Sequence, residues 1–414
     1  MDQPKNKDQI KSIKDHRQIG KDLDLFTTSE LVGPGLPLIT PRGTIIRNVI
    51  EKYIYDLLEK HGYQHVWTPH IGRRELFEKS GHLEKFKEDM FPVMRAKERD
   101  YVLRAMNCPH HIQIFARKQM SYKEMPQRYA ETATVYRSEQ SGELGGLTRV
   151  LSITQDDAHV FCRKDQVKEE FEKALDINKQ MLKDFNFNKY WIRLSLWDPK
   201  DKKKYLGNEK DWENNQELMR NLLIETKTPF KEVVGEAAFY GPKMDLMVVD
   251  SHGREWQLST IQLDFNLPER FNITYVGEDG KNHQPYIIHR ATFGSVERFM
   301  GVWLEHIQGQ IPLWLAPIQI MVLPIGDKQE DYAKKIVEDL KKEGIRAELD
   351  NRPERLQAKI RDGSLQKVPY LGIIGDREIE SKNISVRMRD GKDLGLLKIS
   401  VFLQKLKEEI DKKI

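Results

Sequence analysis

The segment YRSEQSGELGGLTRV holds side chains suited to phosphate chemistry. Arg137 and Glu139 precede a glycine-bearing loop, and Arg149 follows it. Arginine has a planar fork that holds two phosphate oxygens at once, and its charge offsets the charge that develops when a phosphoryl or adenylyl bond is attacked. The two arginines could therefore face one triphosphate. The alternative, which the spacing alone favours, is that both arginines only pair with surface acids.

The usual nucleotide-binding loops are missing from this sequence. It has no GxxxxGK[ST] motif, and no GxGxxG motif follows a strand and opens a helix. A nucleotide would therefore need a different kind of phosphate-binding site. The only cysteines are Cys108 and Cys162, which are too few for a disulfide framework and indicate a reducing compartment, so either is free to bind a metal.

Two kinds of element must position these side chains in the first part of the chain. Apolar residues recur at helical spacing across residues 44–62, and Gly62 gives a stop signal. The following YQHVWTPHI reads as an edge strand interrupted by Pro69. Residues 129–161 read as strand, glycine-rich loop and strand, and a helix is expected from Asp165 to about Asp184. Further strand-like segments at 237–250, 254–268 and 285–293 predict an α+β domain with a central antiparallel sheet.

The character of the sequence changes near Trp314. From there, strand-like and helical segments alternate up to a terminal helix, which predicts an α/β domain with a mostly parallel sheet. We therefore expect a polar N-terminal extension over residues 1–20, one domain over 21–313 and a second over 314–414.

Composition sets the broad class. The chain has 414 residues, of which 39% are hydrophobic and 32% charged, enough for two ordinary domains with real cores. The formal net charge of +4 permits nucleic acid as a partner without demanding it. The longest apolar stretches fall short of the roughly 18 to 20 residues of a membrane span, and the N-terminus lacks the features of a targeting peptide. We expect a cytoplasmic protein without a membrane partner.

Several segments resemble a known family. The helix leading to Pro69, the hairpin with Arg137 and Arg149, and HRATFGSVERF with Arg298 look like motifs 1, 2 and 3 of the class II aminoacyl-tRNA synthetases, in the right order. Within that class, MNCPHHIQIF, TQDDAHVF, FYGPKMD, TIQLDFNLP and PYIIHRATFGSVERF are similar to threonyl-tRNA synthetase segments. The resemblance extends from Asp15 to the end of the chain. It implies a class II catalytic domain over residues 21–313 and an anticodon-binding domain over 314–414.

The resemblance implies a zinc ion, one per subunit, bound by Cys108, His159 and His289. Three protein ligands leave an open position, as in catalytic zinc sites. The amino group and hydroxyl of threonine can fill it, whereas valine has no hydroxyl to offer. Spacing alone would not have found these residues, because a lone histidine in a strand is usually packed or solvated. Cys162 matches no ligand position and reads as a core residue.

The resemblance also implies an adenylation site. Attack of the threonine carboxylate on the ATP α-phosphate releases pyrophosphate, and a terminal ribose hydroxyl of tRNA(Thr) then takes the threonyl group, with Mg2+ accompanying ATP. The implied catalytic residues are Arg137 at the α-phosphate, Arg298 at the γ-phosphate and His82 at the transfer step, for which a surface histidine is the alternative. The implied ATP-binding residues are Arg137, Glu139, Arg149, Lys243, Gln257 and Arg298. The implied threonine-binding residues are Met106, Gln155, Asp157, Tyr240, Gln262 and Ser295.

In the second domain, Arg361, Glu378 and Arg387 match family positions near anticodon bases. Single-stranded bases are read there by hydrogen bonds and stacking. Pro353 stands where the family often has Asn, and a proline cannot replace the hydrogen bonds of that amide. Arg352, Arg355 and Lys359 could contact phosphates or be exposed helix charge, and both readings stay open.

Three further expectations follow from the resemblance. Bacterial-type relatives carry N-terminal editing domains that have no counterpart here, so we expect measurable serine misacylation by this chain. Class II enzymes commonly dimerise through motif 1, so we expect a homodimer, although the helix could instead only cover its own sheet. DNA is not expected as a partner. The alternatives are a catalytically inactive tRNA-binding paralogue, which fold resemblance alone permits, and a prolyl- or seryl-tRNA synthetase.

Overall fold

The computed structural model describes residues 13–413, so most of the expected N-terminal extension lies outside the described residues. The chain divides into two compact units. The core unit comprises Thr28–Leu38 and Arg47–Trp303, and the terminal unit comprises Ile39–Ile46 and the described residues of 1–27 and 304–414. The division at Trp303 lies before the boundary expected at residue 314. No helix among the described residues is both long and apolar enough to cross a membrane.

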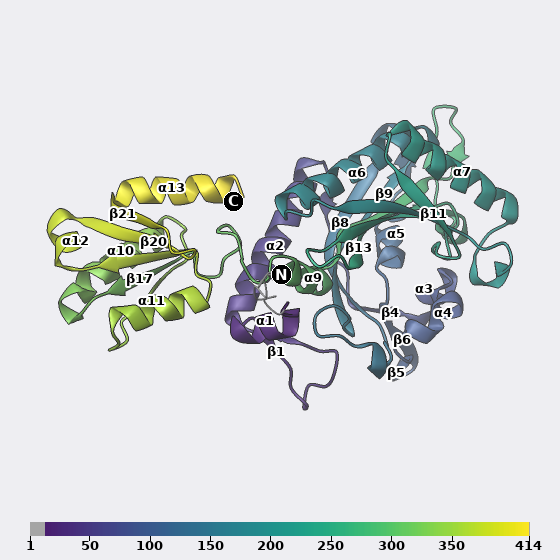
Figure 1. The fold of residues 1–414 in the computed structure, drawn as a ribbon. Helices are drawn as coiled ribbons and strands as arrows, with labels where there is room; N and C mark the ends of the chain where they lie inside the picture. The colour runs from purple at the N-terminus through teal and green to yellow at the C-terminus, as the bar shows by residue number, and fades with distance from the viewer. Residues whose placement is uncertain (1–12, 414) are drawn as a thin grey trace, which may run out of the picture. The chain divides into compact units, whose positions relative to one another are not determined.

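A large sheet forms the centre of the core unit (Figure 1). Its described strands lie in the order β11 (Phe230–Val234), β10 (Tyr190–Leu196), β12 (Lys243–Val249), β13 (Glu255–Asp264), β16 (Tyr286–Ser295), β9 (Ser152–Cys162), β8 (Gln127–Tyr136) and β3 (Gln64–His65). The pairings from β10 through to β8 are antiparallel, and the two outermost pairings, β10 with β11 and β3 with β8, are parallel. The expected hairpin over residues 129–161 is the antiparallel pair of β8 and β9.

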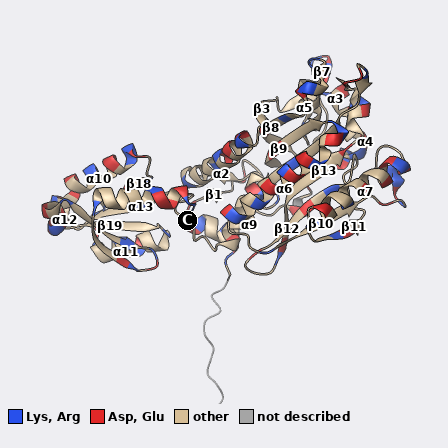
Figure 2. Cartoon of the chain, turned by 90° about the horizontal axis from the view of Figure 1, so that it is seen from above, with Lys and Arg blue, Asp and Glu red and all other residues tan. Residues whose placement is uncertain are grey.

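Helices pack against the apolar side chains of the sheet. Figure 1 shows α6 (Val167–Asp184) running across the sheet, and it contacts β9, β13 and β16. Acidic and basic residues are interspersed along this helix (Figure 2), while Phe171, Leu175 and Met181 are buried. The helix α5 (Cys108–Phe115) packs with β9 in another apolar cluster that includes Phe115, Phe161 and Ile287. The α+β character is as the sequence predicts.

The expected helix over residues 44–62 is α2 (Pro41–Lys60), and Gly62 follows it with a φ of +77°. Within the expected edge strand, Gln64 and His65 form β3, which does lie at the sheet edge, and Ile71 already belongs to the next strand. The remaining described elements of this part of the chain are β1 (Phe26–Thr27), β2 (Leu38–Ile39), β4 (Ile71–Arg73), α3 (Arg74–Lys79), α4 (His82–Lys85), β5 (Met94–Ala96), β6 (Arg99–Leu103), β7 (Met120–Ser121), α7 (Glu209–Glu225), α8 (Leu267–Phe271), β14 (Tyr275–Val276), β15 (Asn282–His283) and α9 (Val296–His306).

The terminal unit contains a mixed sheet. Its described strands lie in the order β18 (Ala347–Leu349), β17 (Ile320–Pro324), β19 (Tyr370–Ile374), β20 (Asn383–Met388) and β21 (Asp393–Lys398), and its described helices are α1 (His16–Asp22), α10 (Glu330–Lys342), α11 (Leu356–Leu365), α12 (Asp376–Ser381) and α13 (Ile399–Asp411). The pairings of β17 with β18 and β19 are parallel, but β19, β20 and β21 pair antiparallel. The expectation of a mostly parallel sheet is therefore met only in its first half. In the second half, a tight turn at Gly391 (φ +93°) joins β20 and β21 as a hairpin.

Candidate active site and metal centre

Three potential metal ligands from distant parts of the chain meet in the core unit. The antiparallel register of β9 and β16 sets His159 directly opposite His289, and Cys108 begins α5 beside them. One ligand atom from each of the three lies within 4.8 Å of the others, and all three residues are buried. The sheet register thus brings together the set that the resemblance implies.

Each histidine of this set uses one ring nitrogen for another contact. Nε2 of His289 lies 2.9 Å from Oδ2 of the buried Asp264, and Nδ1 of His159 lies 2.8 Å from Nδ1 of His111. Nδ1 of His289 and Nε2 of His159 are therefore the nitrogens available for a metal. Burial raises the pKa of the Cys108 thiol, so a thiolate at this position requires a neighbouring cation.

A cavity of about 700 Å³ opens beside these ligands, and a smaller one of about 90 Å³ leads into them. The two cavities share part of their lining, so they lie next to each other. The smaller cavity is bordered by the metal-ligand set and Asp157, and the larger one by the arginines of the expected adenylation site. The shared lining residues are Met106, Arg137, Gln155, Tyr240, Thr260, Gln262 and Ala291.

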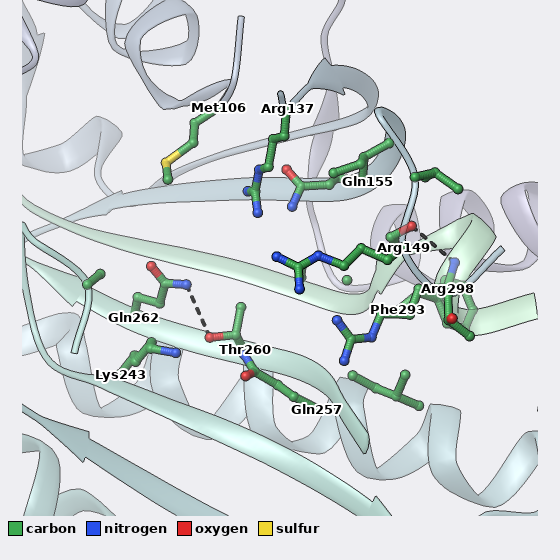
Figure 3. Close-up of a pocket in the computed structure, with 18 of the residues that line it drawn as sticks. Met106, Arg137, Arg149, Gln155, Lys243, Gln257, Thr260, Gln262, Phe293 and Arg298 are labelled. Carbon is green, nitrogen blue, oxygen red and sulfur yellow. Dashed lines mark hydrogen bonds between the residues drawn. The ribbon is translucent and has the colours of Figure 1, made fainter. Parts of the chain in front are cut away.

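Three guanidinium groups point into the larger cavity (Figure 3). Arg137 stacks over the Phe86 ring and Arg298 over the Trp256 ring. Burial lowers the pKa of both arginines, yet neither makes an ion pair with any residue of the described range 13–413. Two partly buried cations without a counter-anion favour the binding of an anion.

Arg149 differs from the other two arginines. It is exposed and pairs with Glu139 at 2.6 Å and with Glu143 at 2.8 Å. The hydrogen bond that Arg149 donates to the Glu139 carboxylate raises the pKa of Arg149. The alternative reading, that hairpin arginines pair with surface acids, therefore holds for Arg149 and fails for Arg137.

Polar side chains on β12 and β13 line the opposite wall of the cavity (Figure 3). Lys243 donates to Oδ2 of the buried Asp245 at 2.8 Å, and Gln257 donates to its Oδ1 at 2.8 Å. Arg193 donates both to Asp245 and to Oε1 of Gln257. Lys243 and Gln257 are thus held in place by Asp245 at the edge of the cavity.

The residues expected at threonine fall into two groups. Met106, Gln155, Tyr240 and Gln262 line both cavities, and burial raises the pKa of Asp157 in the smaller one to about 7. Ser295 lines only the larger cavity. Its hydroxyl donates to Glu297 and accepts from the backbone N–H of Arg298, so it begins α9.

His82 is not a surface residue, so that alternative is wrong. Its side chain is 0% exposed, with Nδ1 2.7 Å from the Ser80 hydroxyl. Its Nε2 lies 3.6 Å from Sγ of Cys108 and 3.2 Å from Sδ of Met106. Burial lowers the pKa of His82 to about 3, so the ring is neutral. It lies beside the metal-ligand set.

A backbone bulge shapes the end of β16. The pairing with β9 shifts between Ala291 and Ser295, and the carboxylate of Asp156 accepts from the N–H groups of Thr292, Phe293 and Gly294 at 2.7 to 3.1 Å. Gly294 has a φ of +74°, and a Cβ there would lie 2.6 Å from the Leu258 carbonyl oxygen, so only glycine fits. The bulge sets the position from which α9 presents Arg298.

Sequence reasoning missed the residues behind the ligands. Asp264, His111 and Glu131 contact the ligand set or each other, and none of them stood out from spacing. For two of them, the position in the sequence relative to an expected site residue could have indicated the contact. Asp264 lies two residues after Gln262 on β13, hence on the same face, and His111 lies one helical turn after Cys108.

In the terminal unit, the expected anticodon residues have different surroundings. Arg361 and Arg387 are exposed. The carboxylate of Glu378 is buried and accepts from the Gly375 N–H and the Ser385 hydroxyl, so it fixes the start of α12. These contacts show that Glu378 serves the local structure.

The residues around Pro353 line a cavity of about 320 Å³ together with Asn351, Arg355 and Lys359. Lys359 is buried and donates to the Pro324 carbonyl at 3.1 Å, so it is not exposed helix charge. Arg352, by contrast, is half-exposed and pairs with Asp350 and Asp362.

Comparison with known families matches both parts of the chain. The family described as tRNA synthetase class II core domain (G, H, P, S and T) matches residues 90–307, and the anticodon binding domain matches residues 319–409. These matches confirm the class II core and the anticodon-binding domain that the resemblance implies.

Comparison with individual relatives identifies the family more narrowly than the two domain matches do. The chain is 48% identical over 401 residues to a threonine–tRNA ligase from Aquifex aeolicus (strain VF5), which covers 97% of this chain and 62% of that protein. The chain thus spans about three fifths of the length of the curated relative it matches. A solved structure of the RNA binding domain of threonyl-tRNA synthetase from Cryptosporidium parvum Iowa II is 36% identical, with a TM-score of 0.91, over 96% of this chain and 98% of that one.

A prolyl-tRNA synthetase from Giardia lamblia shares the fold alone. It is 19% identical, with a TM-score of 0.75, over 96% of this chain and 79% of that one. Identity therefore separates the threonyl relatives from the prolyl ones, and the match covers nearly the whole of the chain. The chain belongs to the threonyl-tRNA synthetase family of the class II aminoacyl-tRNA synthetases.

Proposed function

We propose that the chain is a threonine–tRNA ligase that activates L-threonine with ATP and transfers it to the terminal adenosine of tRNA(Thr). One observation carries the proposal: a small cavity bordered by Cys108, His159 and His289 lies next to, and shares lining residues with, a large one lined by three arginines. A site for a hydroxyl-bearing amino acid next to a site for a triphosphate is the arrangement that adenylation of threonine requires.

The three ligands fit a zinc ion. One thiol and two imidazoles are ligand types that Zn2+ prefers, and three protein ligands leave a position for substrate. The other ring nitrogen of each histidine already has a hydrogen-bonding partner, as expected around a zinc site. When bound, the zinc supplies a Lewis-acidic position that an amino group and a neighbouring hydroxyl can both occupy.

The protein groups around the amino acid then complete its recognition. Asp157 offers a carboxylate to the substrate ammonium, and Gln155, Tyr240 and Gln262 offer hydrogen bonds in the shared lining. Tyr240 donates to Gln262, which fixes the side-chain amide. Met106 closes the apolar side, and Ser295 contributes through the start of α9.

In the activation step, the threonine carboxylate attacks the α-phosphate, and pyrophosphate leaves. Arg137 stabilises the charge that develops on the α-phosphate oxygens, and Arg298 holds the γ-phosphate. ATP is expected to arrive with Mg2+. Glu139 and Arg149 contact the adenine and triphosphate, and Lys243 and Gln257 hold the nucleotide from the opposite wall.

The transfer step needs positioning more than acid–base chemistry, because the adenylate already provides a good leaving group. His82 is proposed to assist here. Its neutral, buried ring beside Met106 supports a role in shaping the amino-acid end of the cavity.

Residues 314–414 are proposed to bind the anticodon, and residues 21–313 to carry catalysis. Arg361 and Arg387 are exposed and available to bases, and Glu378 supports the loop before α12. The cavity around Asn351 and Pro353 is a candidate position for a splayed base.

A homodimer and a cytoplasmic location complete the proposal. The edge strand β3 is followed by Trp67, which is 75% exposed, and Tyr55 on α2 is 44% exposed. Large apolar side chains at a sheet edge favour a two-fold interface. Sedimentation of the purified chain as a monomer would contradict the dimer.

Amino-acid-dependent exchange between ATP and pyrophosphate tests the function. We expect exchange with threonine, loss of exchange after treatment with a zinc chelator, and recovery on adding Zn2+. Exchange with proline or serine in preference to threonine would assign the chain to another member of the class. Absence of exchange with all three would favour an inactive tRNA-binding paralogue.

A further inference from the structure

A buried chain of hydrogen bonds leads from the metal ligand His159 to a carboxylate. Nδ1 of His159 lies 2.8 Å from Nδ1 of His111, and Nε2 of His111 lies 3.2 Å from Oε2 of Glu131. His111 is 0% exposed, His159 1% and Glu131 5%. The chain is therefore shielded from solvent, where a hydrogen bond fixes the position of hydrogens most strongly.

Glu131 is surrounded by donors. The backbone N–H of Thr68 donates to its Oε1 at 3.1 Å, and the Thr68 hydroxyl and Asn107 donate to its Oε2 at 2.7 and 2.9 Å. Arg104 donates to Oε1 at 3.4 Å. Burial alone would raise the pKa of Glu131, but the hydrogen bonds from His111, Thr68 and Asn107 and the charge of Arg104 outweigh it and lower the pKa to about 2. Glu131 is thus an acceptor only.

This acceptor determines where the hydrogens lie along the chain. Because Glu131 cannot donate, Nε2 of His111 must carry a hydrogen to bond with it. In a neutral His111, Nδ1 is then an acceptor, and it takes a hydrogen from Nδ1 of His159. Nε2 of His159 is left with a free lone pair, which is the form that binds a metal.

Asn107 permits a competing arrangement. Its Oδ1 accepts from Arg104 at 2.7 Å, which fixes the amide so that Nδ2 also lies 2.8 Å from Nε2 of His111. If Nδ2 donated there, the hydrogens of both rings would shift, and Nε2 of His159 would be protonated and unable to bind a metal. The negative charge of Glu131 favours the first arrangement over this one.

We propose that Glu131 and His111 are positioning residues that hold the ring of His159 and select its metal-binding tautomer. The inference rests on the proposed zinc site and deepens it. Asp264 supports His289 directly, whereas His159 is supported through an intervening imidazole. Loss of a hydrogen-bond partner behind a metal ligand typically costs about 10- to 100-fold in metal affinity.

The Glu131→Gln variant tests the selection of the tautomer. Thr68 N–H and Arg104 both donate to Oε1, so the glutamine oxygen takes that position and its NH2 group faces Nε2 of His111. The NH2 group then donates to that nitrogen. This reverses the direction of the hydrogen bonds from residue 131 through His111 to His159. We expect about 10- to 100-fold weaker binding of Zn2+ by the purified full chain, measured by competition with a chromophoric chelator.

Three further variants separate this role from simple loss of packing. His111→Leu removes both nitrogens, whereas His111→Asn keeps an acceptor near the position of Nδ1. Glu170→Gln alters another buried carboxylate, which lies 2.5 Å from its ion-pair partner Arg128 and is not part of the hydrogen-bonded series behind His159. We expect His111→Leu to resemble Glu131→Gln, His111→Asn to recover part of the affinity, and Glu170→Gln to bind zinc like the unaltered chain.

The absorption of the Co2+-substituted chain gives a second readout. We expect the visible bands to shift in Glu131→Gln and His111→Leu and to stay unchanged in Glu170→Gln. Equal zinc affinity and equal spectra in all four variants would overturn the inference while leaving the zinc site intact. An unaltered chain that holds no zinc would overturn the zinc site itself. If Glu131→Gln fails to fold, the contrast between His111→Asn and His111→Leu decides the question.

Discussion

Arg47 on α2 and Glu297 on α9 form an ion pair, with Nη1 and Oε1 3.0 Å apart. Thr154 on β9 joins them, because its hydroxyl accepts from Arg47 at 2.7 Å and its N–H donates to Glu297 at 2.8 Å. One side chain or backbone group from each of the three motif-bearing segments therefore meets at a single carboxylate. Since Glu297 is the neighbour of Arg298 in the chain, this junction also holds the helix that carries Arg298, which we propose to hold the γ-phosphate.

Replacement of Glu297 by alanine should destabilise the chain strongly. The change leaves the buried N–H of Thr154 without its partner and removes one of the two carboxylates that pair with Arg47, which together cost about 1 to 3 kcal/mol in the free energy of unfolding. Urea denaturation measures the change. The matched control is Glu75→Ala, whose partner Arg73 is exposed like Glu75 itself, and it should leave stability unaltered. Equal effects of the two substitutions would contradict the importance of the junction.

The arginines should differ in their effect on activation. Arg137 is partly buried and has no counter-anion, so Arg137→Gln should reduce kcat/KM for threonine-dependent pyrophosphate exchange by about 100- to 1,000-fold. Arg149 is exposed and already paired with Glu139 and Glu143, so Arg149→Gln should cost less. Steady-state exchange at varied ATP compares them. A larger loss from Arg149→Gln would contradict the assignment of Arg137 to the reacting phosphate.

The site should discriminate between amino acids more strongly by the presence of a hydroxyl group than by the size of the side chain. Serine keeps the hydroxyl and lacks one methyl group, which lowers kcat/KM by about 10- to 200-fold. Valine keeps the size and lacks the hydroxyl, so a site built around that group rejects it by about 10,000-fold or more. Pyrophosphate exchange with each amino acid measures the ranking. Valine activated as well as serine would indicate selection by shape.

Glu131 should make stability depend on acidic pH. Its folded pKa of about 2 lies below the ordinary value of 4.5, so the ionised form is favoured in the folded state. The contribution of ionised Glu131 to the free energy of unfolding is fully present above pH 4.5 and is lost as the pH falls from 4.5 towards 2. With zinc removed by a chelator, the difference in unfolding free energy between the unaltered chain and Glu131→Gln should shrink by about 2 kcal/mol between pH 6 and pH 3. A constant difference would contradict the shift.

Local patterns predicted the elements that a single segment determines. The apolar spacing over residues 44–62 corresponds to α2, and the glycine-bearing loop after Arg137 does join two antiparallel strands. These features depend on residues close in sequence, where periodicity and turn chemistry act directly. The antiparallel half of the second sheet was not predicted, because the direction of β20 beside β19 depends on how the chain returns to the sheet after α12, which no local pattern reports.

The site could not be predicted in the same way. His159 and His289 meet only because β9 and β16 pair in one register, and a shift of one residue would turn either ring to the other face. The resemblance supplied this set, but not the residues behind it. Glu131 reaches the ligands through His111 on a different element, and no spacing within either segment reports that contact.

The carboxylate of Asp156 has a consequence for hydrogen exchange. Thr292, Phe293 and Gly294 lie in a bulge where no neighbouring strand accepts their N–H groups in register, yet all three donate to this one side chain. Their amide protons should therefore exchange as slowly as those of a central strand. In Asp156→Ala, rapid exchange should be confined to these three amides at first, so the segment that leads to Arg298 would open before the sheet around it does.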